Sequence, residues 1–185
     1  LLPSNLRDTT KLDQFTQELR LASTGVGPFS WVFGGFYSHV NRDYQQRLPT
    51  PGYDAFIDAG LGAGVSAGAD NGFGLHDNPY HADLPYVIKQ KALFGEASYK
   101  FGQIKLTGGG RWYDFSETRD FISGGLFANG DRRIGDKTKS NGFSPRGIVS
   151  WEPNRRLSVN VQVAKGFRLG GINDPLNIPL CTPAD

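Results

Sequence analysis

Four side chains that could bind a metal ion lie close together in one polar stretch of the chain: His76, Asp77, His81 and Asp83. Imidazole and carboxylate groups are common protein ligands of zinc and other divalent cations. Their spacing matches no regular ligand pattern, and the stretch shows no helix or strand periodicity that would fix their geometry. We therefore expect solvated loop residues here, and we predict neither a metal site nor a cofactor.

A glycine-rich run over residues 60–74 could in principle cradle a phosphate group. The run lacks the Lys-Ser/Thr pair and the strand-to-helix context of such loops, so a flexible outer loop is the better interpretation. No Ser-His-Asp arrangement can be assembled from the chain. Glu18, Glu96 and Glu152 fall near basic residues, which favours ion pairs over acid–base catalysis. We expect a protein that is not an enzyme.

Six long stretches alternate strictly between two kinds of side chain, which is the pattern of β-strands with two different faces. The strands are expected at residues 12–22, 29–43, 87–101, 103–116, 142–152 and 156–168. Over residues 15–21, 29–37, 93–101, 104–112, 143–151 and 157–163, one face has no Asp, Glu, Lys or Arg and is apolar or glycine except at Gln17, whereas the other is polar and carries both signs of charge. A basic side chain at the centre of a bilayer costs about 2–4 kcal/mol, so a lipid-facing surface excludes it. The apolar face is therefore expected to meet lipid.

The polar face is expected to line the aqueous interior of a barrel. Its charged candidates for contacts inside the barrel are Glu18, Arg20, Glu96, Lys100, Lys105, Arg111 and Arg146, with Glu152 alongside them. The stretch at residues 29–43 fits the pattern least well, because Val32 and Phe36 are bulky and apolar and fall on the polar side.

A soluble β-sandwich also alternates apolar and polar residues along its strands. Soluble strands are mostly about 5–6 residues long, whereas these stretches reach the ~9–11 residues that a tilted strand needs to cross a membrane. Aromatic residues also flank an aliphatic middle, as in the girdles of membrane barrels. They are Phe29, Trp31, Tyr99, Phe101 and Trp151 beside the short connections, and Tyr37, Trp112 and Phe143 toward the other ends. The predicted fold class is all-β, an antiparallel transmembrane β-barrel segment.

The connections between these strands alternate between short and long. Short turns are expected around Gly25, Gly102 and Asn154, and long connections at residues 44–86, 117–141 and 169–185. Outer-membrane barrels have short periplasmic turns and longer extracellular loops. The long connections are therefore expected outside the cell, where they would contact a small-molecule ligand.

Composition agrees with a barrel and argues against other classes. Hydrophobic residues make up only 38% of the chain, and no apolar run is long enough for a transmembrane helix. The net charge of +2, with basic residues spread along the chain, gives no nucleic-acid surface. The single cysteine, Cys181, could form a disulfide with a cysteine elsewhere in the protein or remain a free thiol. Because six strands with open edges cannot persist in lipid, we expect residues 1–185 to be part of a larger barrel.

Several segments, in this order, resemble successive hairpins of TonB-dependent outer-membrane receptors. They are residues 17–23 followed by 31–37, residues 92–99 followed by 106–113, and residues 143–146 followed by 163–173. The last of these, with its Gly-Phe-Arg-x-Gly-Gly sequence from Gly166 to Gly171, is the most specific. The resemblance covers most of the chain outside the long connections, and no single segment would suffice without the order of the others.

The resemblance implies a barrel of about 22 strands around a plug domain, of which this chain would be an internal part without the plug and the C-terminal strands. It implies uptake across the Gram-negative outer membrane of a scarce solute such as a ferric siderophore, haem, cobalamin or an oligosaccharide. The TonB complex would supply the energy through the plug, which the charged polar face would contact. The alternatives are a passive porin-type channel or adhesin-type barrel and, less consistent with the strand lengths, a soluble carbohydrate-binding β-domain.

Overall fold

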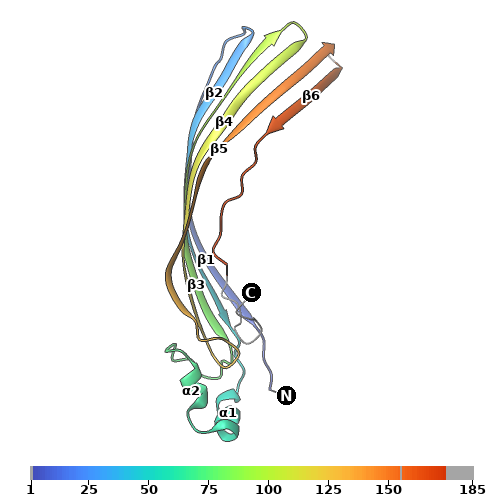
Figure 1. Ribbon diagram of the computed structural model, residues 1–185. Coiled ribbons are helices and arrows are strands. Elements are labelled where there is room, and N and C mark those ends of the chain that lie inside the picture. Colours follow the sequence, from blue (N-terminus) through green and yellow to red (C-terminus); the bar gives the residue numbers. More distant parts are fainter. Residues whose placement is uncertain (1, 155, 174–185) are drawn as a thin grey trace, which may run out of the picture.

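The computed structural model describes residues 2–154 and 156–173 and folds them into one curved antiparallel sheet (Figure 1). Its strands follow chain order and are β1 (Arg7–Ala22), β2 (Phe29–Arg47), β3 (His81–Phe101), β4 (Ile104–Gly124), β5 (Arg132–Asn154) and β6 (Leu157–Ala164). Short turns join the strands at one end of the sheet and long connections join them at the other. The predicted all-β antiparallel fold class is confirmed.

The pairing register keeps each predicted face continuous across the sheet. Residues that pair directly across two strands point to the same face. One row of direct partners on the predicted apolar side is Leu19, Gly35, Leu93, Trp112 and Phe143. The next row, on the predicted polar side, is Arg20, Gly34, Phe94, Arg111 and Ser144. The alternation assigned to each strand separately is thus consistent between strands, and we call the two sides the apolar face and the polar face.

The apolar face is covered by no second layer within the described part of the chain. Its aliphatic side chains are widely exposed, with Leu19 at 68%, Val161 at 63% and Val163 at 77%. Both helices lie at the end of the sheet with the long connections, away from this face (Figure 1). Monomeric soluble proteins rarely leave so large an apolar surface in water. The face therefore suits a hydrocarbon environment.

The strands reach further into the long connections than the sequence predicted, so the boundaries expected at residues 44–86 and 117–141 are wrong. β2 continues to Arg47, β3 begins at His81, β4 continues to Gly124 and β5 begins at Arg132. The apolar face becomes polar in these extensions, at positions such as Gln45, Thr118 and Lys139. With polar residues on both faces, the alternation signal disappears although the strand continues.

The last predicted strand is also corrected, because β6 ends at Ala164 and not at residue 168. The connection predicted at 169–185 is described only to residue 173, and Cys181 lies outside the described residues.

The connection between β2 and β3 is folded and is not the structureless loop that its glycine content suggested. It holds α1 (Tyr53–Leu61) and α2 (Val65–Ala69). Gly52 and Gly64 precede the two helices with φ of 83° and 81°, a left-handed conformation that glycine adopts without strain. Among the described residues, no helix is both long and apolar enough to span a bilayer.

Two aspartates accept hydrogen bonds from backbone N–H groups at the starts of these helices. Asp77 accepts from Asp54 N at 3.0 Å and from Gly52 N at 3.1 Å, and Asp58 accepts from Ser66 N at 2.9 Å. These donors, the Asp54 and Ser66 N–H groups first, hold the pKa of the Asp77 and Asp58 carboxyl groups below its usual value. The charges also stabilise the helix starts, where N–H groups lack partners within the helix.

Candidate functional site

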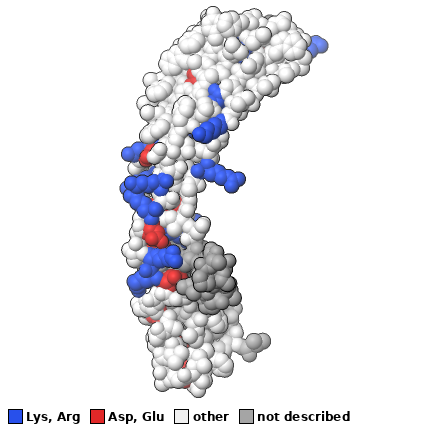
Figure 2. All heavy atoms as spheres, in the orientation of Figure 1, with Lys and Arg blue, Asp and Glu red and all other residues white. Residues whose placement is uncertain are grey.

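A charged cluster occupies the middle of the polar face, around an open pocket of about 400 Å³. Five of the seven predicted lumen residues line this pocket: Glu18, Arg20, Glu96, Arg111 and Arg146. They come from four different strands, β1, β3, β4 and β5, because the register brings their rows together. In Figure 2, the visible charge lies mainly across the middle of the molecule, with little at the end that carries the short turns.

Ion pairs and aromatic rings hold this cluster in place. Arg20 pairs with Glu18 on the same strand, and Arg146 Nη1 lies 3.5 Å from Glu96 Oε2. The guanidinium carbons of Arg20 and Arg111 lie 5.7 and 5.9 Å from the centre of the Phe94 ring. Contacts of this kind are worth about 0.5–1 kcal/mol at exposed sites. The cluster is therefore built from alternating cations and rings as well as from ion pairs.

Phe36 and Val32 are the two bulky residues that did not fit the polar pattern, and the structure gives a reason only for Phe36. Phe36 presents its ring to Arg111, with the guanidinium carbon 5.3 Å from the ring centre. Phe94, on the same face, needs Gly34 beneath it, because a Cβ at Gly34 would lie 2.5 Å from the ring. Val32 lines the same pocket without a polar contact of its own.

The remaining two predicted lumen residues do not join the cluster. Lys100 and Lys105 are directly paired near the short turns, and Lys100 Nζ lies 2.8 Å from Glu152 Oε2. Both partners of this ion pair are well exposed, and exposed pairs of this kind contribute little to stability.

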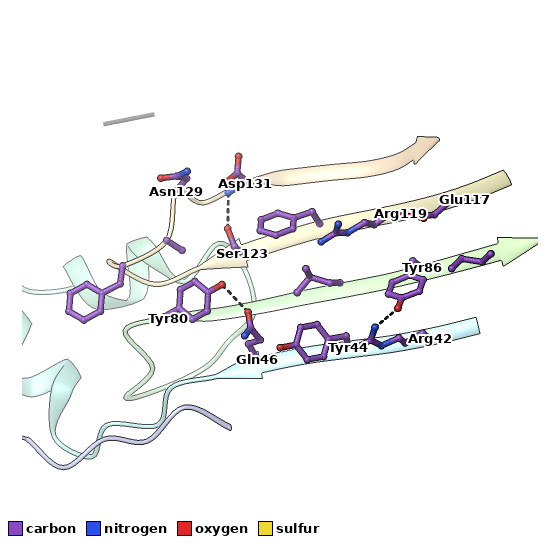
Figure 3. Close-up of a pocket in the computed structure, with 15 residues that line it drawn as sticks. Arg42, Tyr44, Gln46, Tyr80, Tyr86, Glu117, Arg119, Ser123, Asn129 and Asp131 are labelled. Atoms are coloured by element: carbon purple, nitrogen blue, oxygen red, sulfur yellow. Dashed lines mark hydrogen bonds between the residues drawn. The ribbon is translucent and has the colours of Figure 1, made fainter. Parts of the chain in front are cut away.

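A second pocket, of about 620 Å³, lies on the polar face where β2, β3 and β4 extend toward the long connections. Figure 3 shows its lining side chains along these strands and from the connection that follows β4. All of its lining residues except Arg42 and Ile88 fall within the ranges predicted as outer loops, but most of the lining belongs to strands. We call it the upper pocket, which means the pocket nearer the long connections; these connections are at the bottom of Figure 1.

Arginine and tyrosine side chains make up five of the fifteen residues that line the upper pocket, and Glu117 and Asp131 add two carboxylates (Figure 3). The Arg42 guanidinium lies between two rings, 5.1 Å from the centre of Tyr44 and 5.2 Å from that of Tyr86, and donates to the Tyr86 hydroxyl. Arg119 Nη1 donates to the backbone carbonyl of Ile172 at 2.9 Å. A planar guanidinium held against rings suits anionic, planar groups, which it can bind through paired hydrogen bonds.

The sequence interpretation missed Tyr44, Tyr86 and Arg119, because it took their segments for loops. It also missed Arg42, because it did not follow the polar face to the end of the strand predicted at residues 29–43. One signal was available: Arg42, Tyr44 and Gln46 continue the two-residue period of the polar face beyond residue 43.

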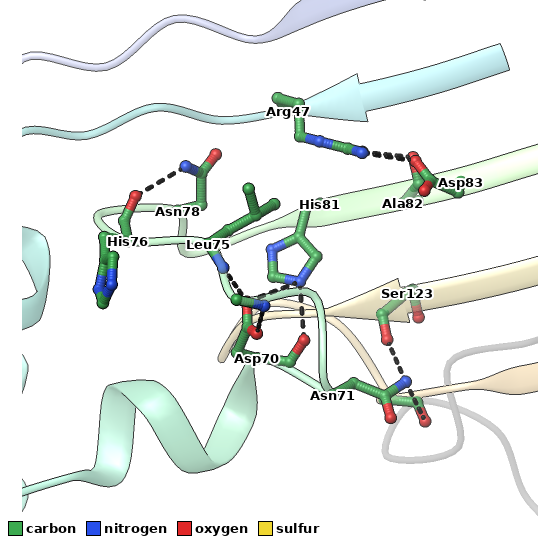
Figure 4. Close-up of polar contacts among 12 residues, drawn as sticks. Arg47, Asp70, Asn71, Leu75, His76, Asn78, His81, Ala82, Asp83 and Ser123 are labelled. Atoms are coloured by element: carbon green, nitrogen blue, oxygen red, sulfur yellow. Dashed lines mark hydrogen bonds and ion pairs between the residues drawn. The ribbon is translucent and has the colours of Figure 1, made fainter.

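The four residues considered as metal ligands are dispersed into separate contacts, and Figure 4 labels three of them, His76, His81 and Asp83. His81 is only 1% exposed, with Nε2 3.0 Å from the Asp70 carbonyl oxygen and its ring 4.4 Å from that of Phe73. Asp83 Oδ1 accepts from Arg47 Nη2 at 2.6 Å. The remaining two are also separate: His76 pairs with Asp54, and Asp77 accepts from the start of α1. The expectation of solvated loop residues is thus wrong for His81, which is buried at the base of a folded connection.

No group of three or more His, Cys, Asp and Glu side chains is arranged to hold a metal ion among residues 2–154 and 156–173.

A single curved sheet with an exposed apolar face and a charged opposite face defines the chain as a segment of an outer-membrane β-barrel. The family model described as TonB dependent receptor-like, beta-barrel, matches residues 3–179. The chain therefore belongs to the family of TonB-dependent receptor barrels, which reside in the outer membrane of Gram-negative bacteria. Proteins of this family are transport receptors and not enzymes.

A solved structure shares the fold. It is the ferric yersiniabactin uptake receptor FyuA from Yersinia pestis, with a TM-score of 0.63 and 14% sequence identity. The match covers 86% of this chain and 21% of that receptor, so the chain spans about a fifth of the length of the structure it resembles. No curated protein sequence matches the chain.

Proposed function

We propose that this chain is part of an outer-membrane receptor that actively takes up a scarce solute, such as a ferric siderophore, haem or cobalamin, with energy from the TonB complex. The family membership supports this proposal, as does the likeness to a ferric yersiniabactin uptake receptor. The observation that carries it is the continuous division of the sheet into an exposed apolar face and a charged polar face. The whole protein would be a barrel of about 22 strands closed around a plug domain.

In this proposal the charged cluster faces the plug. Arg20, Arg111 and Arg146 outnumber Glu18 and Glu96 in the cluster, so a plug surface with carboxylates would complement it. The pairs on the barrel wall are part-exposed and open on one side, which leaves room for a partner. Lys100 and Lys105 would face the lumen nearer the periplasm.

The upper pocket would receive the ligand from outside the cell. It lies between the charged cluster and the long connections, on the face that would line the lumen. Its arginine and tyrosine side chains favour a solute with negative charge and flat, conjugated groups. A ferric siderophore with phenolate or carboxylate ligands has this chemistry.

The test is growth of a strain that lacks its other iron receptors, on medium in which a single ferric siderophore is the iron source. The full-length receptor should restore growth with at least one of a panel of such complexes, and deletion of TonB should abolish it. Growth that persists without TonB would instead indicate a passive channel and would overturn the proposal.

A further inference from the structure

The chain leaves the sheet after β6 and crosses the polar face. Residues 165–173 run along the concave side of the sheet (Figure 1). The Phe167 ring stacks on that of Tyr113, with the ring centres 4.2 Å apart and the planes 20° apart. Tyr113 pairs directly with Ala92, which is the partner of Phe36, so its side chain belongs to the polar face. We call residues 165–173 the strap.

A proline in β5 accounts for the point of departure. Lys165 N donates to the Pro145 carbonyl oxygen at 3.0 Å. In an antiparallel ladder, residues paired by hydrogen bonds exchange two of them, one in each direction. Proline has no N–H, so Pro145 cannot return a bond to Lys165. The ladder between β5 and the following chain is therefore interrupted where the strap begins.

Tyr113 and Gly142 form the part of the polar face on which the strap packs. Tyr113 is only 8% exposed and lies over its direct partner Gly142. A Cβ at Gly142 would lie 2.9 Å from the Tyr113 hydroxyl oxygen, so a larger residue there would displace the ring. Glycine at this position thus lets Tyr113 lie flat beneath Phe167.

The far end of the strap reaches the upper pocket. The Ile172 carbonyl accepts the hydrogen bond from Arg119 Nη1, and Arg119 lines that pocket. A Cβ at Gly170 would lie 3.2 Å from the Thr138 hydroxyl oxygen, which places this part of the strap beside β5.

We propose that the strap is a specificity-determining element of the upper pocket: Phe167 anchors it on Tyr113, and the Ile172 carbonyl positions Arg119 in the pocket wall. The role in specificity rests on the proposed uptake function. The course of the strap does not, because it follows from Pro145, Gly142 and the contacts of the strap itself.

Disulfide mapping in the full-length receptor distinguishes the strap from a continued strand. If the β5–β6 register of Arg146 with Ala164 continued, Thr138 would face Ile172. In the strap, Thr138 lies beside Gly170, whereas a Cβ at Gly166 would have no neighbour within 4 Å. Cysteines that form a disulfide have Cβ atoms about 3.5–4.5 Å apart.

With Cys181→Ser as background, the pair Thr138→Cys with Gly170→Cys should form a disulfide, identified by mass spectrometry of the unreduced peptides. The matched pair Thr138→Cys with Gly166→Cys should remain reduced. Failure of the 138–170 pair, or efficient linkage when Thr138→Cys is combined with Ile172→Cys instead, would overturn the course of the strap.

Chemical modification tests whether the strap positions Arg119. Phenylglyoxal should modify Arg119 about fivefold faster in the Phe167→Ala receptor, the ratio expected for loss of one hydrogen bond of typical strength. Gly142→Val should have the same effect by displacing Tyr113. The rate at Arg42, in the same pocket but held by Tyr86, is the internal control and should not change. An unchanged rate at Arg119 in both variants would refute the positioning role, and neither result depends on whether uptake is active or passive.

Discussion

Arginine substitutions at neighbouring positions of β6 give a sharp test of the two faces. Val161 lies on the apolar face, is 63% exposed and pairs directly with Val149. Its neighbour Gln162 points to the polar face and pairs with Ile148. Val161→Arg should therefore place a charge in lipid, whereas Gln162→Arg should place the same charge in water.

The magnitude follows from the depth of the substituted position. An arginine on the lipid side of a barrel destabilises it by roughly 2–4 kcal/mol at the midplane and by about 0–1 kcal/mol near the interface. Val159 pairs with Trp151, in the aromatic row beside a short turn, and Val163 pairs with Gly147, nearer the middle of the apolar band. The penalty should thus rise from Val159→Arg through Val161→Arg to Val163→Arg. At the midplane it corresponds to a change of roughly 30- to 700-fold in the folding equilibrium.

The assay is the amount of full-length receptor assembled in the outer membrane, measured by its heat-modifiable migration on gels. Gln162→Arg should assemble like the parent receptor, and the three apolar-face variants should assemble progressively less. Equal losses for Gln162→Arg and Val161→Arg would refute the assignment of the faces.

Three further substitutions test the polar face and the folded connection. Gly34→Ala should lower stability by about 1–3 kcal/mol, because its Cβ would lie 2.5 Å from the Phe94 ring, while Gly35→Ala, with no contact closer than 3.6 Å, should have little effect in thermal melting. Arg42→Lys keeps the charge but loses the planar group between Tyr44 and Tyr86, so uptake of the ferric complex that supports growth should need about tenfold more of it; unchanged uptake would exclude Arg42 from the ligand site. Backbone donors lower the pKa of Asp77, so its stabilisation of α1 should be complete above the ordinary carboxyl pKa and lost as the pH falls through the lowered value. The protection of the Asp54 amide, which is its exchange rate relative to that of an unstructured peptide at the same pH, should fall in that acidic range, and Asp77→Asn should remove this pH dependence. A pH dependence of the protection that survives the substitution would contradict this role.

The sequence predicts the membrane-spanning part of the fold well, because there the environment acts on every second residue. The direct pairing of Leu19, Gly35, Leu93, Trp112 and Phe143 joins residues that were assigned to the apolar face strand by strand. Lipid on one side and polar surroundings on the other impose this contrast, so it can be recognised without knowledge of the pairing.

The strand extensions and the upper pocket could not be predicted in the same way. At Gln45, Thr118 and Lys139 the continuation of the apolar face is polar, so the two faces no longer differ in hydropathy. The strands continue because the hydrogen bonds between neighbouring strands extend from the predicted part of the same sheet. This is a tertiary effect that local sequence does not reveal. Tyr44 and Arg119 therefore seemed to be loop residues, although each lies on a strand.

The charged cluster was predicted as a set of residues but not as an arrangement. Period-2 spacing places Glu18, Arg20, Glu96, Arg111 and Arg146 on one face, yet only the register shows that these five meet around one pocket. Phe36 was described only as an exception to the polar pattern. Its contact with the Arg111 guanidinium could not be predicted, because contacts between rings and guanidinium groups on different strands leave no periodic signal.

The most direct test of the proposed function is the conductance of the intact, full-length receptor in a planar lipid bilayer. A barrel that is filled by a plug contacting the charged cluster should give no steady current. A stable open-pore current from the unmodified receptor would contradict energised uptake and would show that the polar face lines a passive channel.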